Sequence, residues 1–250
     1  MPTYITESHY NILEKYFDLK RRRKYSIPEI LNAILFLVDN GLKWRSLYVL
    51  NIPYQLVFYY FRKWTLDGSL DGMQKELLEQ ARLAAGRESA PTVCIIDSQS
   101  VKNDAFVSDD VGIDGNKKVR GRKRHIAIDT QGNLLDVVVT AANEHDGIQG
   151  CSLIKDVLAR YPSIELVFAD GGYAGQFVTF VENQCKKMVE IVPKAVGTGF
   201  KVIKRRWKVE QAIANLGNNR RLAKDYEKLI ASSEIMLVLS SIILLINRIL

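Results

Sequence analysis

The first 85 or so residues carry apolar positions at the spacing of amphipathic helices. The run ILNAILFLVDN has this period; Ser26-Ile-Pro-Glu29 before it reads as a capping box, and Gly41 after it is a stop signal. A second segment, YQLVFYYFRKWTLDG, follows Pro53, and a further helix is expected over about 69–85. Helix, short turn and aromatic-rich helix favour a helix-turn-helix DNA reader and a plain helical bundle equally.

After residues 86–92 (GRESAPT), which read as a linker, the pattern changes to short apolar runs rich in β-branched residues. These runs predict strands at 92–97, 124–129, 134–142, 164–170 and 189–194, with helices at about 148–160, at about 174–187 and from about 205. The order β-β-β-α-β-α-β-α indicates an α+β fold.

The C-terminal stretch 235–250 is strongly apolar, but it has only 16 residues and is interrupted by Ser240, Ser241, Asn247 and Arg248. About 20 apolar residues are needed to span a bilayer. We therefore expect a buried helix and no membrane association.

The charge balance is basic, with 35 Lys and Arg against 28 Asp and Glu. The basic residues concentrate in three places: 20–24 (KRRRK), 117–124 (KKVRGRKR) and 201–228, which has nine basic groups against three acidic ones. One charge run is usually a solvated face, whereas three separate runs favour a nucleic-acid partner.

Cysteine and histidine exclude some classes of protein. Cys94, Cys151 and Cys185 are odd in number and far apart, which excludes a disulfide framework and a cysteine zinc site. They suit a reducing cytoplasm, and the N-terminus lacks the apolar region of a signal peptide. Three histidines disfavour a histidine-based nuclease.

Three acidic residues are candidates for chemistry. Asp97 is expected to end the first strand of the mixed domain and Asp170 the fourth, and Asp170 is followed by two glycines that leave room for a ligand. Glu210 lies in RRWKVEQAIANL, on one helix face with Arg206. A carboxylate after a buried strand is costly unless compensated, for instance by a metal ion. Capping or loop roles for the aspartates, and a surface pair of Glu210 with Arg206, remain alternatives.

Seven segments together resemble transposases of the IS5 insertion-sequence family, within the DDE superfamily. They are ILNAILFLVDNGLKWRSL, FYYFRKWTLDG, DSQSVK (97–102), GRKRHIAIDTQG (121–132), VVVTAANEHD (137–146), ADGGYAG (169–175) and RRWKVEQAIANLGNNRRLAKDYE (205–227). The chain departs from the family at Tyr48, where a proline is usual, at Asn215, where an aromatic is usual, and at Asn218, where a basic residue is usual.

The resemblance implies a helical DNA-binding module over 1–86, an RNase H-like catalytic domain over 90–230, and a C-terminal helix over 231–250 that packs on the core or on a partner subunit. It also implies that Asp97, Asp170 and Glu210 are the catalytic residues and hold two divalent ions, Mg²⁺ with Mn²⁺ as a substitute. The partners implied are double-stranded DNA, both transposon inverted repeats and target, and a second copy of the chain.

From the basic runs we expect DNA contacts at Lys117, Lys118, Arg120, Arg122, Lys123, Arg124, Arg206, Trp207, Arg220, Arg221 and Lys224. His145 and Asp146 are expected either to contact and position the residues that bind the metal ions or to serve only as turn and cap residues. Asp109, Asp110 and Asp114 are expected to solvate the neighbouring basic run. A non-catalytic DNA-binding repressor and an RNase H-fold nuclease remain alternative functions.

Overall fold

The computed structural model describes residues 3–17, 23–192 and 206–249. Contacts divide the chain into two compact units. The helical unit comprises Met1–Ser89, Leu216–Ala223 and Ile235–Leu250, and the sheet unit comprises Ala90–Asn215 and Lys224–Glu234. The C-terminal part of the chain therefore contributes to both units.

The helical unit contains five α-helices in the described residues: α1 (Glu7–Leu13), α2 (Ile27–Asn40), α3 (Tyr54–Leu66), α4 (Ser69–Ala84) and most of α8 (Ile230–Ile249). Short 3₁₀ helices cover Glu14–Tyr16, Trp44–Leu50 and Arg220–Leu222. The three helices expected before residue 86 are confirmed, and α1 was not predicted.

Helix α2 begins and ends as its sequence predicts. The Ser26 amide and hydroxyl both donate to the Glu29 carboxylate at 2.7 Å, and the Glu29 amide donates to Ser26 Oγ at 3.3 Å. Gly41 follows the helix with φ of 66°, a left-handed conformation that glycine adopts without strain.

The aromatic residues of α3 are divided between core and surface. Tyr60, Phe61 and Trp64 are buried, whereas Tyr59 is 53% exposed. The Trp64 ring packs against those of Tyr60 and Phe17. Packing in the core of the helical unit therefore explains the presence of three of these aromatic side chains.

Helix α8 supplies apolar side chains to the core of the helical unit, and the expected buried helix is confirmed. Two of its buried serines have polar partners in this unit: Asn219 donates to Ser240 Oγ at 2.6 Å, and Gln74 donates to Ser241 Oγ at 3.4 Å. The helix is long and apolar enough to cross a membrane by length and composition, but 67% of its most apolar window is buried within the protein.

The described residues of the sheet unit form six strands: β1 (Val93–Lys102), β2 (Gly112–Ile113), β3 (Arg120–Ile128), β4 (Leu134–Ala141), β5 (Leu166–Asp170) and β6 (Met188–Val192). β3 pairs antiparallel with β1 and with β4, whereas β5 is parallel to both β1 and β6. The strand order β4-β3-β1-β5-β6, with the short β2 also on β3, is that of an RNase H-like sheet. The predicted α+β, RNase H-like fold class is confirmed.

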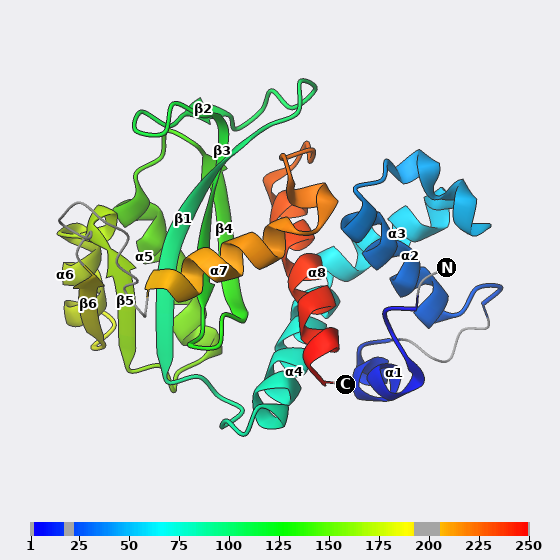
Figure 1. Ribbon diagram of the computed structural model, residues 1–250, viewed down its shortest axis with the longest axis horizontal. Coiled ribbons are helices and arrows are strands. Elements are labelled where there is room, and N and C mark those ends of the chain that lie inside the picture. The colour runs from blue at the N-terminus through cyan, green and yellow to red at the C-terminus, as the bar shows by residue number, and fades with distance from the viewer. Residues whose placement is uncertain (1–2, 18–22, 193–205, 250) are drawn as a thin grey trace. The chain divides into compact units, whose positions relative to one another are not determined.

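In the part of the chain that the structure describes, three α-helices accompany this sheet: α5 (Asp146–Arg160), α6 (Gln176–Asn183) and α7 (Arg206–Gly217). α5 packs on β3, β4 and α6, and Figure 1 shows it behind the sheet with α7 in front. α6 is shorter than expected from the sequence. The predicted strand 189–194 begins one residue earlier, and its last two positions lie outside the described residues.

The side chain of Arg122 on β3 joins the sheet to the segment that follows α7. It is fully buried, its Nη1 lies 3.4 Å from Asp225 Oδ2, and its guanidinium donates to the carbonyls of Asp109, Glu227 and Lys228 at 2.8–3.0 Å. A buried ion pair leaves a costly unpaired charge when one partner is removed. Arg122 is therefore a structural residue of the sheet unit.

We expect Ser26→Ala to lower the free energy of unfolding by about 1 kcal/mol, because it removes one half of the capping box. Denaturant titration of the full chain measures this change. Ser26→Thr, which keeps the hydroxyl, is the matched control and should lose much less stability. Equal losses in the two variants would contradict the capping role.

We expect Arg122→Met to lower the free energy of unfolding by about 3–5 kcal/mol, because it leaves the buried Asp225 carboxylate without its partner. Arg120→Met on the same strand changes an exposed arginine and should cost much less. Adding Asp225→Asn to Arg122→Met should recover part of the loss, and strictly additive effects in thermal or denaturant melts would contradict the pairing.

Candidate active site

Asp97 and Asp170 lie at the same level of two neighbouring strands. β1 and β5 pair in parallel with Ile95 opposite Phe168, and each aspartate follows two residues later. Because side chains alternate between the faces of a strand, both carboxylates leave the sheet on the face of Ile95 and Phe168. Neighbouring strands are about 4.8 Å apart, so one group can reach both side chains.

The position of Asp97 within its strand corrects the sequence prediction. Asp170 ends β5 as expected, but β1 continues past Asp97 to Lys102. The physical reason is the antiparallel pairing with β3, which supplies hydrogen-bonding partners along β1 after β5 has ended. Asp97 thus lies where β1 loses its parallel neighbour.

Local backbone hydrogen bonds hold both aspartates. The Ser98 amide donates to Asp97 Oδ1 at 2.7 Å, and the Gly172 amide donates to Asp170 Oδ1 at 2.8 Å. Asp170 thereby caps the 3₁₀ helix Gly171–Tyr173. A side chain at Gly171 would meet no atom within 4 Å, so the space beside Asp170 is open.

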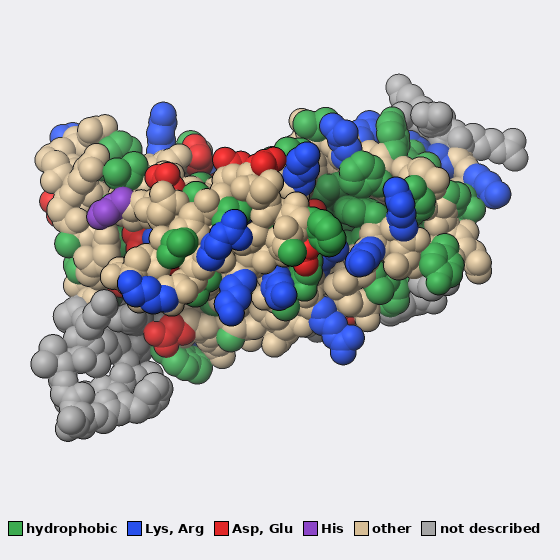
Figure 2. Space-filling model, turned by 90° about the horizontal axis from the view of Figure 1, so that it is seen from above, with side chains coloured by type: hydrophobic (Ala, Val, Ile, Leu, Met, Phe, Trp, Pro, Cys, Tyr) green, Lys and Arg blue, Asp and Glu red, His purple; other side chains and the backbone are tan. Residues whose placement is uncertain are grey.

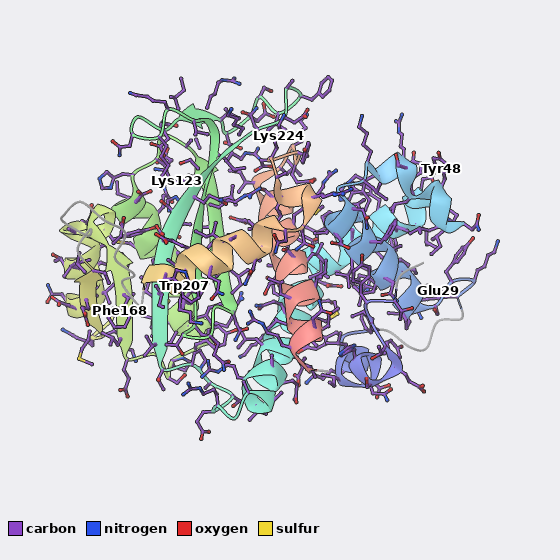
Figure 3. The ribbon with its side chains drawn as sticks, in the orientation of Figure 1. Glu29, Tyr48, Lys123, Phe168, Trp207 and Lys224 are labelled. Carbon is purple, nitrogen blue, oxygen red and sulfur yellow. The ribbon has the colours of Figure 1, made fainter. Side chains whose placement is uncertain are left out.

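Helix α7 reaches the cavity that these aspartates line. The other lining residues come from β1, β5, β6 and α7: Ile95, Ile96, Phe168, Ala169, Val192 and Val209. Val209 is buried, and Glu210 follows it directly with an exposed side chain. Figure 3 labels Phe168 on β5 and Trp207 at the start of α7. The helix that carries Glu210 therefore packs against the aspartate cavity.

The donor chemistry fits a hard divalent cation. Mg²⁺ prefers oxygen ligands, keeps several waters, and is commonly held by one or two carboxylates together with substrate phosphates. Asp97 and Asp170 supply two such carboxylates from adjacent strands. Within residues 3–17, 23–192 and 206–249, however, no three His, Cys, Asp or Glu side chains form a cluster that could hold one ion. Glu210 is not part of a preformed three-ligand site.

A third acidic residue, Asp146, lies beside Asp170. A side chain at Gly172 would place its Cβ 3.0 Å from Asp170 Oδ1 and 3.4 Å from Asp146 Oδ2, so the two carboxylates flank this glycine. Asp146 Oδ1 lies 3.0 Å from Lys123 Nζ and 3.9 Å from His125 Nδ1. Asp146 therefore connects the aspartate pair to two buried groups of β3.

Tyr173 is fully buried close to these carboxylates. Burial raises the pKa of its hydroxyl well above the usual range, and the charges of Asp146, Asp97 and Asp170 raise it further. Gly150 on α5 makes room for the tyrosine ring, because an added Cβ there would lie 2.7 Å from a ring carbon. The sequence prediction did not identify Tyr173, although its place in ADGGYAG beside Asp170 is a usable signal.

His125 is also buried, and its Nε2 lies 3.2 Å from Thr140 Oγ1 on β4. Burial lowers the pKa of His125 to about 4, and the charge of Asp146 opposes this shift only in part. The imidazole is therefore neutral near pH 7.

The predicted DNA-contacting residues separate into exposed and buried groups. Exposed side chains are those of Lys117, Lys118, Arg120, Trp207, Arg220 and Lys224. Buried side chains are those of Arg122, Lys123, Arg124 and Arg221, which bond to partners inside the protein. Burial removes these four from direct contact with phosphates. Arg206 begins α7, but its side chain lies outside the described residues.

One of the exposed cations lies close to the aspartates. Lys117 Nζ donates to the Ser98 carbonyl at 3.2 Å, one residue after Asp97. Figure 2 shows Lys and Arg side chains spread over one face of the sheet unit, at the left of the view, with acidic side chains between them. Lys117 therefore offers positive charge next to the candidate site.

Comparisons with known proteins identify the family. A family model described as "Transposase DDE domain" matches residues 88–246. No curated protein matches the chain. A solved structure described as a pre-cleavage Mos1 transpososome is 11% identical, with a TM-score of 0.35 and coverage of 93% of this chain and 79% of that one. A Mos1 transposase paired-end complex with left transposon end is 10% identical, with a TM-score of 0.29 and coverage of 87% and 81%.

The family match covers well over half of the chain and includes Asp97, Asp170 and Glu210. The chain therefore belongs to the transposases with a DDE domain.

Proposed function

We propose that this protein is an insertion-sequence transposase of the IS5 family, which binds the terminal inverted repeats of its own element, cleaves DNA at their ends and joins the 3′-hydroxyls to target DNA. The observation that supports this proposal most strongly is that Asp97 and Asp170 lie at the same level on the neighbouring strands β1 and β5. Glu210 lies on a helix that packs against the same cavity. We place the activity in the cytoplasm of the cell that carries the element.

Transposases of this family use divalent metal ions. We propose that Asp97, Asp170 and Glu210 hold two Mg²⁺ ions, with Mn²⁺ as a substitute. Ions held by these residues would supply activation of the attacking oxygen and stabilisation of the leaving oxygen in phosphodiester cleavage. In this proposal the protein fixes the carboxylates of Asp97 and Asp170 through the β1–β5 register, and helix α7 brings the carboxylate of Glu210 to them.

We propose that the exposed cations near the site position the DNA backbone. Lys117 and Lys118 come from the segment before β3, Arg120 is the first residue of β3, and Arg220 and Lys224 come from the segment after α7. Phosphate contacts of this kind fix DNA in place without reading its sequence. Trp207, 42% exposed at the start of α7, and Arg206 are proposed to contact DNA close to the scissile phosphate.

We assign recognition of the inverted repeats to the helices before residue 86, and propose that two copies of the chain act together when two element ends are joined. A synapse of two DNA ends provides the reason for two copies here.

Asp97→Ala, Asp170→Ala and Glu210→Gln should each reduce Mg²⁺-dependent cleavage of labelled transposon ends by roughly 10³-fold or more, because each removes a proposed metal ligand. Binding of the uncleaved ends should remain. Glu182→Gln changes an exposed carboxylate on α6 and should cleave like the wild type.

Undiminished cleavage in the Asp97→Ala variant would contradict the assignment of Asp97 as a metal ligand of the cleavage site. Metal-independent binding of the ends without any cleavage in the wild type would instead indicate a repressor. Faster cleavage of RNA–DNA hybrids than of transposon ends would indicate a nuclease of another function.

The triple variant Lys117→Ala, Lys118→Ala, Arg120→Ala should bind DNA more weakly, and the slope of log K against log salt should become shallower by about 1 for each phosphate contact removed. Lys155→Ala removes an exposed cation from α5 and should leave the slope unchanged. Fluorescence anisotropy across a salt series measures both. An unchanged slope in the triple variant would exclude these residues as phosphate contacts.

A further inference from the structure

Asp146 has two carboxylate oxygens in different surroundings. Oδ1 faces the buried side chains of β3, 3.0 Å from Lys123 Nζ and 3.9 Å from His125 Nδ1. Oδ2 lies 3.4 Å from the point that a Cβ on Gly172 would occupy, and Asp170 Oδ1 lies 3.0 Å from the same point, so the two carboxylates come together at this glycine. The residue thus spans the distance between a buried cation and a proposed metal ligand.

Several features fix Asp146 in this position. It is the first residue of α5, where the helix dipole favours a negative charge. Lys123, labelled in Figure 3, is nearly buried on β3, and its ammonium also donates to the Glu144 carbonyl at 2.8 Å. Close packing of Gly147 and Gly150 brings this end of α5 near Gly172 and Tyr173. The Asp146 carboxylate is therefore held by its position at the start of α5 and by its ion pair with Lys123.

A purely structural ion pair does not explain this arrangement. Lys123 neutralises Asp146 through Oδ1, and neither this ion pair nor the helix dipole accounts for the approach of Oδ2 to the Asp170 carboxylate at Gly172. Like charges brought together repel each other and are stabilised when a cation comes between them. The arrangement is explained if a cation, or water bound to it, is shared by Asp146 and Asp170.

We infer that Asp146 is a fourth acidic residue of the metal site, a positioning residue that accepts hydrogen bonds from water on an ion held by Asp170, while Lys123 fixes its orientation. This inference rests on the proposed function, because it assumes that Asp97 and Asp170 bind divalent ions. Supporting groups of this kind commonly change metal affinity by about 10–100-fold.

The test is Mn²⁺ binding to the DNA-free full chain, measured by electron paramagnetic resonance or calorimetry. Asp146→Asn should raise the dissociation constant by about ten-fold or more. Asp156→Asn makes the same change at an exposed site on α5 and should bind like the wild type. Asp97→Ala serves as the reference for loss of a proposed direct ligand.

The double variant Lys123→Met, Asp146→Asn separates positioning from structure, because it removes both charges of the buried pair. If Mn²⁺ binding is as weak in the double variant as in Asp146→Asn, the inference is supported. The double variant gives the same test if Asp146→Asn alone unfolds. Recovery of wild-type binding in the double variant would overturn it, since Asp146 would then serve only to neutralise Lys123.

Two further outcomes separate this inference from the proposed function. Wild-type affinity in Asp146→Asn, with binding lost in Asp97→Ala, would overturn the role of Asp146 alone. Wild-type affinity in Asp97→Ala, or no Mn²⁺ binding by the wild-type chain, would overturn the proposed metal site, and the role of Asp146 with it.

Discussion

The parallel pairing of β1 with β5 is the constraint on which the candidate site depends. It sets Ile95 opposite Phe168, and the period of two then puts Asp97 and Asp170 on one face at one level. A shift of one residue in either strand would send one carboxylate to the other face. The apolar runs before both aspartates stabilise this register, because they are buried in the sheet. The same residues that form the core therefore determine the geometry of the proposed chemistry.

The alternation of side chains on β3 determines the roles of its basic residues. Arg122 and Arg124 point to one face of the strand, where they bond to the segment after α7, while Lys123 and His125 point to the other face, toward α5. Burial lowers the pKa of Arg124 to about 10, so this arginine still carries its charge near pH 7. The buried part of a run that looks in sequence like one phosphate-binding patch is thus divided between two internal networks.

The positions of helices and strands could be predicted well from the sequence, whereas the burial of individual side chains could be predicted less well. Helix α2 follows from local signals at Ser26, Glu29 and Gly41, and the positions of the longer strands along the chain follow from short apolar runs. The length of β1 and the burial of Arg122 could not be predicted, because both depend on neighbours remote in sequence: β3 for the strand, and Asp225 for the arginine. Asp97 and Asp170 were predicted from strand ends, whereas the approach of Asp146 to Asp170 depends on the packing of α5 against Gly172 and Tyr173.

The two aspartates and Glu210 are held by different kinds of interaction. Backbone pairing fixes Asp97 and Asp170 through the strands themselves, and backbone amides bind each carboxylate. Glu210 depends on a helix placed by side-chain packing: Val209 lies in the aspartate cavity, and Ala212 lies close to Gly132 of the β3–β4 turn. Strand pairing is defined by a row of hydrogen bonds, whereas packing of a few apolar side chains leaves the helix more freedom to shift. This difference accounts for two carboxylates that line one cavity and for an exposed Glu210 that follows the cavity residue Val209, and it makes α7 the element whose position would complete the proposed ligand set.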